Sequence, residues 1–158
     1  MSGTAAGVST TGLSTGIDGF YHNHLAGWEQ TFSLVDIAQM YQALAQPGHI
    51  NNLSIFTLGV VLSDGRVQLA RISDPSTFMS FGSSYLGSSN FPGFLNTVTP
   101  LFNNATTADQ RTAATIKAFA GSGLTFYEGD ANSLSQGFQR IDATTSSALE
   151  IIRTKCSN

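Results

Sequence analysis

The strongest constraint on the fold is a pair of apolar segments separated by a tight-turn sequence. Residues 53–62 are rich in apolar and β-branched side chains, and residues 66–72 alternate apolar and polar side chains. Ser63-Asp64-Gly65 lies between them, and its glycine accepts the positive φ angles that hairpin turns often require. The sequence therefore predicts a β-hairpin over residues 53–72.

Helices are predicted where capping residues precede a helical apolar spacing. Ser33 with Asp36 and Thr107 with Gln110 resemble capping boxes, in which the two side chains bond to each other's backbone N–H groups. Aspartate followed by proline is a further start signal, found at residues 74–75. The predicted helices cover residues 34–46, a segment from Pro75, a short segment between Pro92 and Pro100, and a segment after Thr107 to about residue 120.

The C-terminal part of the chain has a heptad-like apolar rhythm. A short strand is predicted at residues 124–127, and apolar or small residues then recur at spacings of 4, 3, 4, 3 and 4. The members are Leu134, Phe138, Ile141, Thr145, Ala148 and Ile152. This pattern predicts one long helix over residues 131–155, or two helices with a break near residues 142–144, where Thr144 is a poor helix former.

These elements predict an α+β fold with an irregular N-terminal arm. Residues 1–18 are mostly Gly, Ser, Thr and Ala, a composition that cannot bury enough apolar surface to order itself. The aromatic stretch that follows contains Phe20, Tyr21 and Trp28, and is expected to anchor the arm, with a short helix around residues 22–30. Residues 19–158 are expected to form a single domain, with a small antiparallel sheet covered on one side by helices.

Charge and hydropathy narrow the possible partners. Charged residues make up 11% of the chain, against about 25% in a typical domain, which favours a surface that is covered by other subunits. The net charge of −3 and the scattered Lys and Arg residues argue against nucleic acid as a partner. No apolar run reaches membrane-spanning length and no secretory signal is evident, so a virion or the cytoplasm is the favoured location.

The best candidates for chemistry are two histidines in the sequence Tyr21-His22-Asn23-His24. A His-x-His pair on a strand can direct two imidazoles to one side, as a metal site requires. His49 or Glu29 is a candidate third ligand, and no carboxylate stands at a recognised spacing. In the helix expected at residues 22–30, residues two apart would face different directions. His22, His24 and His49 are therefore weak metal candidates, and surface or interface histidines are the favoured interpretation.

Other catalytic signals are absent or ambiguous in the sequence. No phosphate-binding glycine loop is present, and the one Gly-x-Ser-x-Gly pattern lies in the arm at residues 12–16. Glu128 and Asp130 could act as an acid–base pair, although Asp130 is more simply the cap of the following helix. The sequence therefore predicts no catalytic residue and no cofactor.

Three functions are compatible with these features. The leading hypothesis is a structural subunit of a larger particle, such as a virion, tail or filament, that acts through subunit–subunit contacts. The alternatives are a binding module with an apolar pocket near residues 78–102, and a small metal-dependent enzyme that uses His22 and His24. The predicted interface residues are Phe20, Tyr21, Trp28, Leu134, Phe138, Ile141 and Ile152.

Overall fold

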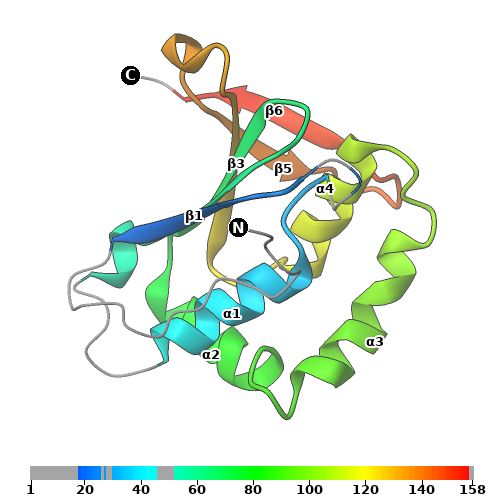
Figure 1. Ribbon diagram of the computed structural model, residues 1–158. Coiled ribbons are helices and arrows are strands. Elements are labelled where there is room, and N and C mark those ends of the chain that lie inside the picture. The colour runs from blue at the N-terminus through cyan, green and yellow to red at the C-terminus, as the bar shows by residue number, and fades with distance from the viewer. Residues whose placement is uncertain (1–17, 26, 28–29, 46–51, 157–158) are drawn as a thin grey trace.

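Six strands form a single sheet in the computed structural model, which describes residues 18–25, 27, 30–45 and 52–156 (Figure 1). The strands are β1 (Gly19–Asn23), β2 (Thr57–Val61), β3 (Arg66–Ile72), β4 (Leu124–Asp130), β5 (Gln139–Ala143) and β6 (Ile151–Lys155). The helices are α1 (Leu34–Leu44), α2 (Pro75–Tyr85), α3 (Phe91–Phe102) and α4 (Ala108–Ala118). Two short 3-10 helices cover Leu53–Ile55 and Leu134–Gln136.

The sheet follows chain order, β1-β2-β3-β4-β5-β6, and mixes two kinds of pairing. β1 pairs with β2 in parallel, and the other four pairs are antiparallel. A parallel pair needs a crossover connection, and α1 lies in the one between β1 and β2. The other three helices all lie in the connection between β3 and β4, and Figure 1 shows the helices gathered on one side of the sheet.

The core lies between one face of the sheet and the helices. On that face the strands contribute fully or nearly fully buried side chains: Leu58, Val60, Ala70, Phe126 and Ile141. The helices contribute Ile37 and Met40 from α1, Phe78 from α2, and Phe94 and Val98 from α3. Burial of these apolar side chains is the main force that holds the helices on this face of the sheet.

The predicted hairpin is confirmed, with a shorter first strand. β2 and β3 pair antiparallel, and Gly65 in the turn has a φ of 89°, as the turn sequence requires. Residues 53–55 form a 3-10 helix instead of the start of the strand. The strand predicted at residues 124–127 is also present and extends to Asp130, so Asp130 ends a strand and does not cap a helix.

The helix starts predicted at Ser33, Asp74 and Thr107 are confirmed, because their signals are local. Both capping boxes form, at Ser33 with Asp36 and at Thr107 with Gln110, and Asp74 accepts a hydrogen bond from the N–H of Thr77. The expected stop at Pro100 is wrong, since α3 continues to Phe102. The last two residues of α3 pack against the core, and this packing outweighs the backbone hydrogen bond that proline cannot donate.

The long C-terminal helix is wrong, in both its one-piece and two-piece forms. Residues 131–155 contain the 3-10 helix and the strands β5 and β6, and the C-terminal element is a strand. The predicted three-stranded antiparallel sheet is therefore corrected to a six-stranded mixed sheet. The class itself remains broadly α+β.

Two physical effects favour strands over a helix in this region. β4 needs a partner on its second edge, and Ile141 of β5 pairs with Phe126 and is buried at 1% exposure. The hydroxyls of the intervening turn bond locally: Thr144 Oγ1 donates to the carbonyl of Ala148 at 3.3 Å, and Ser146 Oγ accepts from its N–H at 3.3 Å. Such bonds compete with helical backbone bonds.

The helix expected around residues 22–30 is also wrong. Residues 19–23 form β1, in register with residues 57–61 of β2. Pairing with a buried neighbour strand overrides the weak local preference of this stretch. Residues 1–17 lie outside the described residues, so the arm, and the single domain over residues 19–158, stay predictions.

Asp74 should make the stability of the fold depend on acid. Hydrogen bonds from the side chain and backbone of Thr77, and from Ser76, lower the pKa of Asp74 to about 2. The unfolded value is about 3.9, so the stabilisation is complete above that pH and is lost as the pH falls from about 4 to 2. Asparagine caps helices about as well and does not titrate. Urea unfolding should therefore show a smaller loss of stability over this range in Asp74→Asn than in the wild type; equal losses would contradict the assignment.

Candidate metal site

Two imidazoles project toward the helices from the end of β1: His22 lies in the strand, and His24 directly follows it. His22 and His24 are two residues apart on an extended segment, so their side chains leave the same face of the sheet. His22 is the register partner of Val60 in β2, and the N–H of His24 donates to the carbonyl of Val61 at 2.9 Å. Pairing with β2 therefore fixes the backbone of both histidines.

A carboxylate faces them from the first turn of α1. The N–H of Asp36 donates to Ser33 Oγ at 3.1 Å, and the N–H of Ser33 donates to Asp36 Oδ2 at 2.9 Å. This capping box stabilises the start of α1 and fixes the orientation of the Asp36 side chain. The same local motif that starts the helix therefore also aims its carboxylate.

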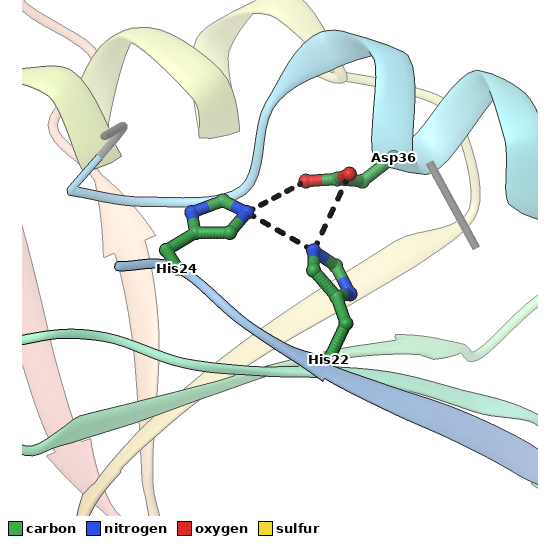
Figure 2. A group of neighbouring side chains, drawn as sticks. All are labelled: His22, His24 and Asp36. Carbon is green, nitrogen blue, oxygen red and sulfur yellow. Dashed lines mark hydrogen bonds and ion pairs between the residues drawn. The ribbon is translucent and has the colours of Figure 1, made fainter. Parts of the chain in front are cut away.

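The three side chains converge on one small volume, as Figure 2 shows. The Nε2 atoms of His22 and His24 are 3.0 Å apart. His22 Nε2 lies 3.3 Å from Asp36 Oδ1, and His24 Nε2 lies 3.4 Å from Asp36 Oδ2. His22 Nδ1 is buried and has no hydrogen-bond partner among the described residues, so the described polar contacts of this ring all run through Nε2.

These separations match the spacing of ligand atoms around a metal ion. Nitrogen and oxygen ligands about 2.0–2.1 Å from a tetrahedral Zn²⁺ are about 3.3–3.4 Å apart. The distance of 3.3 Å between His22 Nε2 and Asp36 Oδ1 agrees with this, and the imidazole–imidazole distance of 3.0 Å is slightly shorter. The 3.4 Å contact of His24 Nε2 is made to the other carboxylate oxygen, Oδ2. Within the described part of the chain, this group is the one whose His, Cys and acidic side chains could hold a metal.

The electrostatics of the cluster keep the carboxylate ionised. Burial by itself raises the pKa of Asp36. Hydrogen bonds from His22, from His24 and from the N–H of Ser33 lower this pKa, and together they outweigh the effect of burial. The net result is a pKa of Asp36 well below its usual value. An ionised carboxylate is the form that binds a metal ion. The side chains are 18%, 8% and 13% exposed for His22, His24 and Asp36, so the cluster lies near the surface.

The structure brings together two of the predicted metal candidates and adds a third group. His49 and Glu29 lie outside the described residues, and their roles stay predictions. The third group is Asp36, twelve residues after His24, which is not one of the recognised ligand spacings in sequence. The capping box marks Asp36 in the sequence as an acid in the first turn of a helix. A helix over residues 22–30 would not direct both histidines toward that acid.

A second charged cluster lies elsewhere in the molecule, and ion pairs join its members. Glu128 accepts hydrogen bonds from Arg66 Nη1 at 3.3 Å, Gln68 Nε2 at 3.0 Å and Arg153 Nε at 3.0 Å. Arg153 also pairs with Asp109 at 2.9 Å. Asp130 Oδ1 accepts a hydrogen bond from the N–H of Asn132 at 2.8 Å. These contacts engage Glu128 in ion pairs and Asp130 in a hydrogen bond to the following turn, and an acid–base role for the two residues stays an untested alternative.

The predicted interface residues lie in different environments. Tyr21 and Ile152 are exposed, at 62% and 51%, whereas Ile141 is in the core of its own chain. Phe20 stacks edge-on against Phe56 with ring centroids 5.6 Å apart. Phe138 is half-buried over the backbone of Gly129. Trp28 and the Leu134 side chain are outside the described parts, and an interface role for any of the seven stays a prediction.

Comparison with protein-family models, with curated proteins and with solved structures finds no match to this chain. Among the described residues, none of the helices combines the length and apolar character needed to cross a membrane. The geometry of the His22–His24–Asp36 cluster is therefore the feature of this chain that points to a function.

Proposed function

We propose that this chain is a divalent-metal-dependent hydrolase whose metal ion, most simply Zn²⁺, is held by His22, His24 and Asp36. The observation that carries the proposal is the convergence of two Nε2 atoms and a carboxylate at 3.0–3.4 Å. Two imidazoles and one carboxylate are a common ligand set of catalytic zinc sites. The long C-terminal helix was one of the features that favoured an assembly role, and that helix is absent from the described residues. The assembly role and the binding module stay separate predictions.

The number of ligands among the described residues, three, favours a catalytic site over a structural one. Structural zinc sites are closed by four protein ligands, whereas catalytic sites use three and keep the fourth position open. A metal ion held here would bring a water molecule to the open position and lower the pKa of that water toward 7. The substrate class is therefore a compound with a carbonyl or phosphoryl centre that this water can attack.

The protein supplies the orientation of the ligands. Asp36 Oδ2 is held by the N–H of Ser33 at 2.9 Å, so Oδ1, 3.3 Å from His22 Nε2, is the oxygen assigned to the metal. Such contacts around a ligand fix its geometry and tune its affinity. The same β1 pairing and capping box that form the fold would thus preorganise the site.

Metal binding by the purified chain tests the proposal. After treatment with a chelator, the protein should take up about one Co²⁺ or Zn²⁺ per chain in calorimetry. Bound Co²⁺ should show the intense visible absorption of a low-symmetry, four- or five-coordinate site. The Zn²⁺ form should then hydrolyse at least one member of a panel of peptides, esters and phosphoesters, and lose the activity in chelator. Failure to bind either ion would remove the proposal, and metal binding without any hydrolysis would reduce it to a binding site.

A further inference from the structure

A buried chain of hydrogen bonds connects the sheet to the segment before α1. Gln68 of β3 is 1% exposed, on the face of the sheet that packs against the helices. Its Oε1 accepts from Thr31 Oγ1 at 2.9 Å, and its Nε2 donates to Thr112 Oγ1 at 3.1 Å and to Glu128 Oε2 at 3.0 Å. The side chain is therefore fully hydrogen-bonded, as a buried amide must be to avoid a large desolvation cost.

Thr31, which Gln68 binds, belongs to a segment that is held by hydrogen bonds at three consecutive positions. Arg66 Nη2 donates to the carbonyl of Gln30 at 3.2 Å, and Thr115 Oγ1 donates to the carbonyl of Phe32 at 3.4 Å. Thr31 lies between them and is itself 2% exposed. Residues 30–32 are thus fastened to β3 and α4 immediately before the N-cap of α1.

These contacts connect the two sides of the proposed metal site, β1 and the start of α1, through the sheet and the segment before α1. His22, Val60 and Gln68 are register partners across β1, β2 and β3, so the sheet fixes the position of His22 relative to Gln68. Gln68 holds Thr31, and Thr31 stands two residues before Ser33. Ser33 orients Asp36, and Asp36 returns to His22 at 3.3 Å.

We propose that Thr31 and Gln68 act as positioning residues that set the distance between Asp36 on α1 and the two histidines at the end of β1. The inference rests on the proposed metal-binding function. An apolar pair at these positions could fill the same volume, but it would not specify the register between the helix start and the sheet. The hydrogen bonds do so, because they require Thr31 Oγ1 and Gln68 Oε1 to meet at one point.

The test compares three single variants in the full chain, with Co²⁺ as the probe. Thr31→Val removes the hydroxyl while keeping the shape, and Thr31→Ser keeps the hydroxyl. Ser122→Ala is the matched control, because Ser122 is fully buried and accepts a hydrogen bond from the N–H of Leu124 at 3.4 Å, at the turn into β4. We expect Thr31→Val to weaken Co²⁺ binding about 10–100-fold and to alter the visible spectrum of the bound ion.

Thr31→Ser should restore both the affinity and the spectrum to near the wild type. Ser122→Ala should lower the urea midpoint of the metal-free protein without changing either property. Equal affinities and spectra in Thr31→Val and the wild type would overturn the positioning role, as would an equal loss in Ser122→Ala. Absence of Co²⁺ binding by the wild type would instead overturn the proposed function together with this inference, so the two failures are distinguishable.

Discussion

Replacing His24 with alanine should lower the affinity for Zn²⁺ by at least about 100-fold. Loss of a contact that only supports a ligand typically costs 10–100-fold, and loss of the ligand itself should cost no less. At free Zn²⁺ about 100 times the wild-type Kd, binding stabilises the folded protein by about 2.7 kcal/mol. A site 100-fold weaker would retain about 0.4 kcal/mol at the same concentration. Thermal and urea unfolding with and without Zn²⁺ measure this difference.

The neighbouring residue provides the control for that experiment. Asn23 is exposed and, as the adjacent residue of β1, projects from the opposite face of the sheet. Asn23→Ala should therefore keep the full stabilisation by Zn²⁺. If His24→Ala were stabilised as strongly as Asn23→Ala, the ion would be bound elsewhere and the assigned ligand set would be incorrect.

Features that depend on neighbouring residues could be predicted from the sequence. The two capping boxes and the Asp74 cap are formed by hydrogen bonds between residues three apart. Both partners are therefore visible in a short stretch of sequence. The hairpin at β2 and β3 belongs to the same kind, because a short turn joins the two strands. These local signals place α1 and the start of its first turn, which carries Asp36.

Features that depend on distant partners could not be predicted in the same way. β1 is a strand because it pairs with β2, more than thirty residues later. β5 is a strand because β4 offers a free edge, and the apolar spacing that suggested a helix contains Ile141, which serves the sheet equally well. The distinction between a helix and a strand was decided by tertiary pairing in both cases.

The candidate site combined both situations. The histidine pair was visible in the sequence, and so was Asp36 in its capping box, but their meeting required β1 to be a strand beneath the start of α1. The incorrect helix at residues 22–30 argued against chelation by the pair, because residues two apart on a helix face different directions. A His-x-His strand followed by a capped helix whose first turn carries an acid is the pattern that would have predicted the cluster.

Two glycines in the turn between α4 and β4 should differ sharply in their tolerance of alanine. Gly121 and Gly123 both have positive φ angles, 75° and 77°. A side chain in this conformation costs about 1–2 kcal/mol at either position. A Cβ on Gly121 would meet nothing within 4 Å, whereas a Cβ on Gly123 would lie 2.5 Å from the carbonyl oxygen of Asp74 and 3.0 Å from the nitrogen of Phe78.

Alanine at position 123 should therefore be destabilising for a second reason, its overpacking against the start of α2. The Asp74 carbonyl accepts the N–H of Phe78 at 2.9 Å, and the Gly123 carbonyl accepts the N–H groups of Ser73 and Asp74 at 2.9 and 3.1 Å. Backbone held on both sides cannot move aside cheaply, and overpacking adds about 1–3 kcal/mol. Gly123→Ala should lose about 2–5 kcal/mol in urea unfolding and Gly121→Ala about 1–2 kcal/mol.

Metal binding separates this effect from damage to the site. The turn at residues 121–123 joins α4 to β4 and packs against the start of α2, whereas the cluster is built from β1 and α1. The fraction of Gly123→Ala that remains folded should bind Co²⁺ with wild-type affinity, while His24→Ala should fold and bind the ion at least about 100-fold more weakly. Equal stabilities of the two glycine variants would contradict the close approach of residue 123 to α2. A loss of affinity in folded Gly123→Ala would mean that the site depends on the β4 side of the sheet as well as on β1 and α1.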